Sequence, residues 1–327
     1  MRTVFFKNKP AIIATSSVGG PKESSGNIGE YLEVKSDDDT FGEKTFEKAE
    51  KKILYTAIGN SINNAKKSVS EIDAIIAGDL LDQIISATFS ARNFDSGYLG
   101  VYNACATFTE AITLGATLIN GGHLNYVVCG TSSHFSSAER QYRYPLELGC
   151  TRPPQAQWTV TGAGACVLGS GKGPKVLSAT IGRVIDFGVV DVNNMGAAMA
   201  PAAADTLYTH FKETGTSPED YDVIASGDLG ALGSEILKDL IWQKGYDISR
   251  NHTDCGKMVY TMNEKEYQGG SGAGCSSMVF CSYFYKKLCE KKIKKMLLMS
   301  TGALLSSLSS QQGESIPGIA HLINIEC

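Results

Sequence analysis

The chain has 327 residues, of which 43% are hydrophobic and 20% charged, and its formal net charge is −4. This composition is typical of a globular protein with one large domain or two ordinary ones. It argues against a dedicated nucleic-acid binder, because the sequence has no basic stripe with interleaved aromatic residues. The longest apolar runs are far shorter than the roughly 18 residues that cross a bilayer, so we expect any membrane association to be peripheral.

The first segment, "MRTVFFKNKPAIIATSS", predicts an initial strand and no secretory signal. Lys7, Asn8, Lys9 and Pro10 interrupt any apolar stretch that such a signal would need. Residues 20–46 are polar and rich in turn-forming residues, and they include an acidic run. We expect this stretch to be a loop inserted after the first strand.

A degenerate internal repeat follows. "DAIIAGDL" at 73–80 and "DVIASGDL" at 222–229 share Asp, Ile, Gly, Asp and Leu in register. Each is an apolar run of strand length that lies between helix-like segments. "NACATFTEAITLGATLIN" at 103–120 aligns in the same way with "AGCSSMVFCSYFYKKLCE" at 273–290. In both copies a cysteine opens an amphipathic helix.

Each copy of the repeat continues with two more predicted strands. The first copy has "NYVVCGTSS" and "GAGACVLGSG", and the second has "KKMLLMSTGAL" and "GIAHLINIEC". Both halves therefore predict the order β-α-β-α-(β)-α-β-β, and buried strands that alternate with helices indicate an α/β sheet. Two such sheets around central helices would place Cys105 and Cys275 at the starts of the two innermost helices.

The nine cysteines do not predict a metal centre or a disulfide framework. They include no CxxC pair and no Cys/His pair at zinc spacing. Most lie inside apolar strand-like or helix-like runs, which is typical of small buried thiols in a reducing compartment. We expect no metal site and no cofactor.

The duplicated halves and the helix-start cysteine resemble the thiolase superfamily, which includes the ketoacyl synthases. Three long segments narrow the resemblance to a thiolase-fold family of endospore formers that is implicated in dipicolinic acid uptake into the forespore. They are "CGTSSHFSSAERQYRYPLELG" (129–149), "RPPQAQWTVTGAGACVL" (152–168) and "HTDCG" (252–256). The resemblance covers essentially the whole chain. It implies a thiolase-like α/β fold whose two pseudo-duplicated halves, 1–173 and 174–327, form one compact α-β-α-β-α sandwich.

The resemblance places Cys105 at the acyl-accepting cysteine of the superfamily, where a helix N-terminus would favour the thiolate. Acyl transfer also needs a base and oxyanion donors. In the condensing branch a histidine and an asparagine supply them, but the corresponding stretches here read "IASGDLG" (224–230) and "GGSGAGC" (269–275). The closing loop also lacks the Cys-x-Gly of thiolases, and His321 lies in a strand-like run. We therefore interpret Cys105 as part of a binding pocket, and no residue as catalytic.

The loop after the strand that ends near residue 133 is the predicted ligand site, because α/β sheets bind ligands at the carboxyl ends of strands. An arginine fork and aromatic walls would suit dipicolinate, a flat dianion with two carboxylates. A solvated salt-bridge set of Glu139, Arg140 and Arg143 is the alternative interpretation of the charges. The predicted ligand-binding residues are Cys105, Ser132, Ser133, His134, Arg143 and Tyr144.

Three functional hypotheses remain open at this point. The resemblance favours a non-catalytic binding protein for dipicolinic acid, free or as its calcium chelate, that acts in uptake through a membrane channel complex. An acyl-transferring enzyme that uses Cys105 and a scaffold for channel subunits are the alternatives. The resemblance further implies a cytoplasmic protein attached peripherally to the forespore or spore membrane, with channel proteins as partners. Homodimer formation stays open.

Overall fold

The computed structural model describes residues 1–142, 152–261 and 268–327. The strands are β1 (Thr3–Phe5), β2 (Ala11–Gly19), β3 (Val34–Lys35), β4 (Ala74–Gly78), β5 (Gly97–Gly100), β6 (Tyr126–Ser133), β7 (Trp158–Thr159), β8 (Gly162–Gly169), β9 (Lys175–Thr180), β10 (Val223–Ser226), β11 (His252–Asp254), β12 (Gly270–Ser271), β13 (Lys295–Ala303) and β14 (Gly318–Glu326). The helices are α1 (Pro21–Ser24), α2 (Phe46–Asn64), α3 (Ile85–Ala91), α4 (Thr107–Asn120), α5 (Phe135–Tyr142), α6 (Met195–Thr214), α7 (Gly230–Trp242), α8 (Cys255–Val259), α9 (Ala273–Val279), α10 (Tyr285–Cys289) and α11 (Ser307–Gln311).

The order of the main strands is the same in the two parts of the chain. The large sheet runs β11-β10-β13-β14-β9-β2-β8-β6-β4-β5, so that β9-β14-β13-β10-β11 repeats β2-β8-β6-β4-β5. In both sets the first two pairings are antiparallel and the last two are parallel. The two sets meet through a single β2–β9 pair, Ala11 with Lys175. The repeat seen in the sequence is therefore a repeat of topology.

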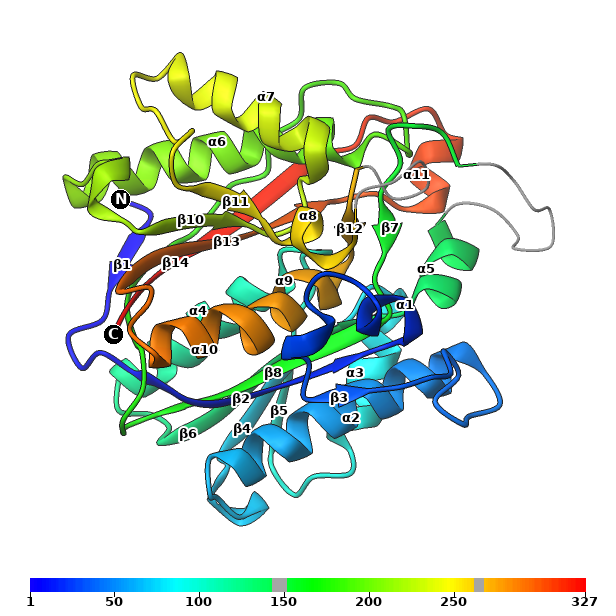
Figure 1. Ribbon diagram of the computed structural model, residues 1–327, viewed down its shortest axis with the longest axis vertical. Helices are drawn as coiled ribbons and strands as arrows, with labels where there is room; N and C mark the ends of the chain where they lie inside the picture. Colours follow the sequence, from blue (N-terminus) through cyan, green and yellow to red (C-terminus); the bar gives the residue numbers. More distant parts are fainter. Residues whose placement is uncertain (143–151, 262–267) are drawn as a thin grey trace.

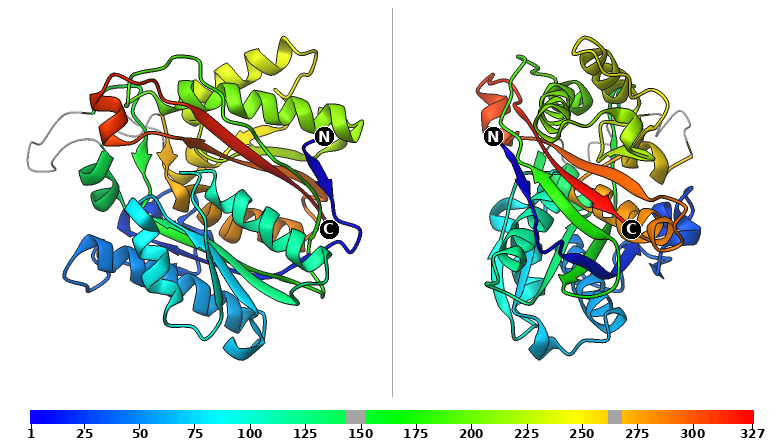
Figure 2. Two further views of the ribbon diagram at one scale, coloured as in Figure 1. Left: turned by 180° about the vertical axis from the view of Figure 1, so that it is seen from behind. Right: turned by 90° about the vertical axis from the view of Figure 1, so that its left-hand side faces the viewer.

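Five layers stack in the order helix, sheet, helix, sheet, helix (Figure 1). Helices α2 and α3 cover the outer face of the first sheet, and α6 and α7 cover the outer face of the second. Helices α4, α9 and α10 lie between the sheets, and both termini lie on the same side of the molecule, on the left in Figure 1 (Figures 1 and 2). The predicted fold class is confirmed. The predicted division at residues 173 and 174 falls between β8 and β9. That the two halves fold only as one unit stays a prediction.

The central helices are apolar because they are covered on two sides. A helix between two sheets has no solvent face, so it needs no polar stripe. Every residue of α9 is buried, and the rings of Phe108 in α4 and Phe280 lie 5.9 Å apart, centroid to centroid. As predicted, Cys105 lies two residues before α4, and Cys275 lies in the first turn of α9.

Two stretches differ from what the sequence predicts. The expected loop at 20–46 contains α1, a 3₁₀ turn and β3, which pairs with the end of β2. Glu23 anchors it, because its buried carboxylate accepts hydrogen bonds from the Thr161 N–H (3.0 Å) and the Tyr260 hydroxyl. The predicted helix at 273–290 contains a π turn over Phe280–Phe284. In the described part of the chain, no helix has both the length and the apolar character needed to cross a bilayer.

Candidate functional site

Cys105 lies in a tight loop that leads into α4. The preceding residue, Ala104, has a φ of 50°, a left-handed conformation that costs free energy for a residue with a Cβ. The loop presses on β13, where a Cβ on Gly302 would come within 2.4 Å of the Asn103 carbonyl oxygen. The absence of a side chain at Gly302 therefore lets β13 support this loop.

Two residues of the second half reach the Cys105 thiol. Ser271, in β12, has its Oγ 4.0 Å from the Cys105 Sγ. Asp228, which follows β10, also interacts with the thiol. The Asp228 Oδ2 accepts hydrogen bonds from the Ser271 hydroxyl (2.8 Å) and the Gly272 N–H (3.0 Å), and its Oδ1 accepts one from the Thr301 hydroxyl (2.8 Å). A buried carboxylate thus occupies the centre of the site.

This environment disfavours the thiolate. Burial raises the pKa of the Cys105 thiol well above its ordinary value, and the Asp228 carboxylate raises it further. The helix N-terminus opposes this by only about 0.3–1 kcal/mol. The expected stabilisation of the thiolate by the helix is therefore outweighed. The sulfur stays protonated at neutral pH, and the N–H and hydroxyl groups beside it are already bonded to Asp228.

The cavity beside Cys105 is small, about 40 Å³, which leaves room for about one water molecule. Tyr102 and Tyr142 narrow its mouth, and their hydroxyl oxygens lie 3.1 Å apart. The Tyr142 hydroxyl also donates to the carbonyl oxygen of Leu80. The described lining residues are Leu80, Tyr102, Ala104, Cys105, Ala138, Glu139, Tyr142, Thr159, Met195, Ser271, Ala303 and Leu305. A larger ligand could enter only if side chains at the mouth move.

The structure does not bring Ser132, Ser133 and His134 into this cavity. All three are buried. The Ser132 hydroxyl donates to Glu50 (3.1 Å), and the Ser133 hydroxyl donates to the carbonyl oxygen of Val160 (2.8 Å). These two side chains therefore have packing roles, and ligand contact remains a prediction without support from their positions.

His134 is held by both ring nitrogens. Its Nδ1 accepts from the Ser136 N–H (3.1 Å), so its Nε2 carries the proton and donates to the carbonyl oxygen of Asp39 (2.8 Å). Burial lowers the pKa of His134. The ring is thus a neutral structural element and has no charge to offer an anion.

Arg143 and Tyr144, the other predicted ligand contacts, lie outside the described residues, and their role stays a prediction. The structure shows the ion-pair partners of the neighbouring residues Glu139 and Arg140. Arg140 pairs with Glu47 on the surface, whereas Glu139 is buried and pairs with Arg152 at 2.9 Å. Of these two described residues, Arg140 fits the alternative of a solvated salt-bridge set and Glu139 does not.

The described residues contain no cluster of three or more His, Cys, Asp or Glu side chains that could hold a metal ion. In the "HTDCG" segment, Asp254 caps α8 by accepting from the Lys257 N–H at 3.1 Å. It also accepts from the Ser226 hydroxyl at 2.6 Å and the Leu229 N–H at 2.9 Å. The segment therefore forms β11 and the start of α8, and the hydrogen bonds of Asp254 are structural.

Sequence reasoning missed Asp228 and Ser271 as site residues, although it singled out both stretches that contain them. The signal for Asp228 was the repeat, because "GDL" occurs at 78–80 and again at 227–229. In the first copy, Asp79 caps the local backbone by accepting from the N–H groups of Leu81 (2.7 Å) and Ala87 (2.6 Å). Only the fold shows that the second copy faces a thiol 123 residues earlier in the chain.

Comparisons with known proteins agree with this architecture. The model of the family Stage V sporulation protein AD matches residues 1–326. The chain is 38% identical over 326 residues to Stage V sporulation protein AD of Bacillus subtilis (strain 168), which covers 99% of this chain and 96% of the relative.

Two solved structures share the fold at low sequence identity. One is 3-oxoacyl-[acyl-carrier-protein] synthase III from Aquifex aeolicus VF5 (TM-score 0.59, 13% identity, 97% and 100% coverage of this chain and that one). The other is the tetronic acid condensing enzyme AbyA1 (TM-score 0.63, 14% identity, 97% and 100% coverage).

Proposed function

Because this chain belongs to the Stage V sporulation protein AD family, we propose that it is a non-catalytic binding protein for dipicolinic acid. It is a sporulation protein with a thiolase-like fold. In the proposed role it takes up dipicolinate at the Cys105 cavity, from the face where Tyr102 and Tyr142 meet, and acts in the transfer of that molecule into the developing spore. Channel proteins at the forespore membrane are the proposed partners.

The observation that carries the non-catalytic part of the proposal is the position of Asp228. The superfamily resemblance assigns a base to this part of the second half, and a base must remove a proton from the thiol. The Asp228 carboxylate, which already accepts hydrogen bonds from buried donors, instead raises the pKa of the Cys105 thiol. An acyl oxyanion would also find the Gly272 N–H and the Ser271 hydroxyl already bonded to Asp228.

The charges around the cavity favour the calcium chelate over the free dianion. Glu139 lines the cavity and is paired with Arg152, and the Asp228 carboxyl group interacts with the Cys105 thiol that lines it. A free dianion would be repelled by Asp228 in a medium of low dielectric constant. A chelate with one Ca²⁺ carries little net charge, so it avoids this cost. We therefore propose that calcium enters the site with the ligand.

Calorimetric titration of the full-length protein with dipicolinate, with and without Ca²⁺, tests the proposed function. We expect binding in the presence of Ca²⁺ and weaker binding without it. Cys105→Leu, which fills the small cavity, should abolish binding, whereas the near-isosteric Cys105→Ser should retain it. Equal binding by Cys105→Leu would move the site elsewhere. No binding by the wild-type protein under either condition would leave the scaffold role as the better account.

A further inference from the structure

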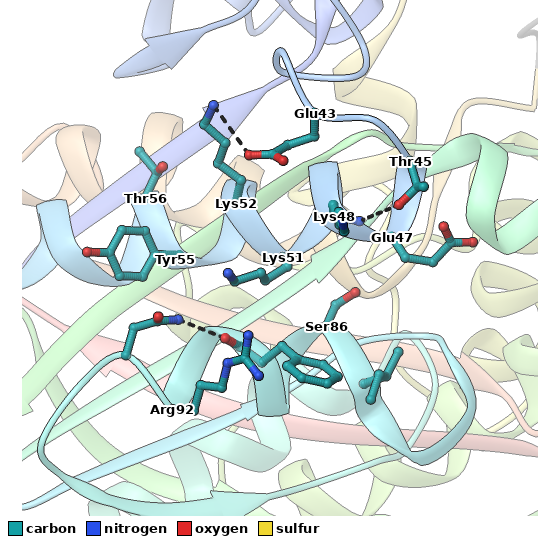
Figure 3. A pocket seen from close by; sticks show the side chains of 13 residues that line it. Glu43, Thr45, Glu47, Lys48, Lys51, Lys52, Tyr55, Thr56, Ser86 and Arg92 are labelled. Atoms are coloured by element: carbon teal, nitrogen blue, oxygen red, sulfur yellow. Dashed lines mark hydrogen bonds and ion pairs between the residues drawn. The ribbon is translucent and has the colours of Figure 1, made fainter.

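A second cavity has no part in the site around Cys105. It lies between α2 and α3 on the outer helix layer of the first half (Figure 3). Its volume is about 690 Å³, which is within the range of pockets that hold small organic ligands. Its lining residues are Glu43, Thr45, Glu47, Lys48, Lys51, Lys52, Tyr55, Thr56, Ile85, Ser86, Phe89, Arg92 and Asn93.

Cations prevail among the charges of this cavity, and three of them have no ion-pair partner among the described residues. Lys48 and Lys51 come from α2, and Arg92 follows the last residue of α3. Lys52 pairs with Glu43 at 3.7 Å, and Glu47 pairs with Arg140 outside the cavity. The two carboxylates are therefore compensated, and a positive charge remains on both helices.

The remaining walls are apolar and partly exposed. Tyr55, Ile85 and Phe89 are 42%, 36% and 37% exposed, although all three have large apolar side chains. The Arg92 guanidinium lies 4.2 Å from the centre of the Phe89 ring, which places a cation over the face of that ring. The cavity thus combines partly exposed apolar side chains with cations from both helices.

Ser86 adds an unused polar group. Its side chain is 2% exposed, and its Oγ has no hydrogen-bond partner among the described residues. Its hydroxyl points from α3 toward α2 (Figure 3). A buried hydroxyl without a partner costs free energy, and an oxygen atom of a bound ligand would remove that cost.

We propose that this cavity binds a small aromatic dianion of the dicarboxylate class. The ring would lie against Phe89 and Tyr55, one carboxylate would contact Arg92, and the other would contact Lys48 or Lys51. Arginine binds a carboxylate through two parallel hydrogen bonds, and lysine serves as a point charge. The proposal is independent of ligand binding at Cys105, because the two cavities share no lining residue.

Isothermal titration of the full-length protein with isophthalate tests this proposal. Isophthalate has two carboxylates on one ring, and it lacks the pyridine nitrogen that makes dipicolinate a strong chelator. We expect saturable binding that weakens as salt is added, because the contacts are partly exposed to solvent. The uncharged diamide of isophthalate should not bind measurably.

Matched variants locate the binding. Arg92→Gln should weaken isophthalate binding about tenfold, and Lys51→Gln combined with Lys48→Gln should weaken it similarly. Lys212→Gln, an equal loss of charge at an exposed position of α6, should leave it unchanged. Cys105→Leu should also leave it unchanged, whatever its effect on dipicolinate. Equal weakening by Lys212→Gln, or wild-type affinity in Arg92→Gln, would overturn the proposal, as would no binding of isophthalate by the wild-type protein.

Discussion

At the scale of single residues, the chemistry of the site depends on Cys105 and Asp228. The place of Cys105 in the repeat identified it from the sequence. The stretch 224–230, which contains Asp228, was noted only because it lacks a histidine. The fold adds that Asp228 lies in this stretch as a buried carboxylate bonded to Ser271, Gly272 and Thr301. Contacts between residues 123 positions apart depend on how the halves pack, and no local pattern encodes that distance.

Replacing Asp228 should change the acidity of the thiol. In Asp228→Asn the negative charge is gone, so we expect the pKa of Cys105 to fall relative to the wild-type protein. The pH dependence of iodoacetamide labelling, followed by peptide mass mapping, measures this pKa. Cys289 and Cys327 are exposed and serve as internal references in the same sample. An unchanged or higher pKa for Cys105 in the variant would contradict the assigned role of Asp228.

His210 makes the stability depend on pH. It lies buried between the Thr180 hydroxyl (2.9 Å) and the Tyr221 hydroxyl (3.0 Å), and burial lowers its pKa to about 4. An unfolded histidine has a pKa of about 6.5. The unfolded chain therefore binds a proton that the native protein does not, and stability is lost as the pH falls from 6.5 toward 4.

The expected loss due to His210 between pH 7 and pH 5 is about 2 kcal/mol. His210→Gln keeps hydrogen-bonding groups without the titration, so its free energy of unfolding should fall less over the same range. Urea unfolding of both proteins at the two pH values measures the difference. Other buried groups titrate equally in both proteins and cancel in the comparison. Parallel losses in the two proteins would show that His210 does not titrate as described.

At the scale of elements, the sequence predicted the helices and strands of the repeat well. Apolar runs bounded by turn residues mark β4 and β10, because parallel strands covered on both faces need no polar positions. The short elements between residues 20 and 46 were not predicted. They are held by tertiary contacts, such as those of Glu23 with Thr161 and Tyr260, and not by a pattern of their own.

Two glycine-to-alanine substitutions distinguish a glycine that is needed for a close contact, Gly302, from one that only makes a helix more flexible, Gly59. Gly302→Ala would place a Cβ 2.4 Å from the Asn103 carbonyl oxygen, so we expect it to lower the free energy of unfolding by about 1–3 kcal/mol and to weaken ligand binding at Cys105. Gly59→Ala, in the middle of α2, meets no atom within 4 Å and should raise stability by about 0.5–1 kcal/mol. Urea unfolding measures both, and a stabilised Gly302→Ala would show that β13 does not support the loop.

At the scale of the whole molecule, the two sheets share one central layer of helices. Its apolar core contains residues of both halves, including Phe108 and Ile112 from the first and Phe280 and Phe284 from the second. Each half alone would expose the apolar face that it now buries against the other. The duplication was visible in the sequence, whereas the size of the shared core depends on side chains that pack across it.

Separation of the halves should therefore prevent folding. We expect a fragment of residues 1–173 to aggregate or to lack a cooperative unfolding transition, and co-expression with residues 174–327 to restore a soluble complex. Circular dichroism and urea titration report the outcome. A soluble fragment 1–173 that unfolds cooperatively would show that the halves are independent domains.

We propose that this thiolase-like protein does not transfer acyl groups, although a cysteine opens its first central helix. Incubation of the full-length protein with acetyl-coenzyme A and with a longer acyl-coenzyme A, followed by intact-mass measurement, tests it most directly. Because burial and Asp228 keep the thiol protonated, we predict no stable acyl adduct on Cys105. A stoichiometric adduct that forms on the wild-type protein and is absent from Cys105→Ser would contradict the account.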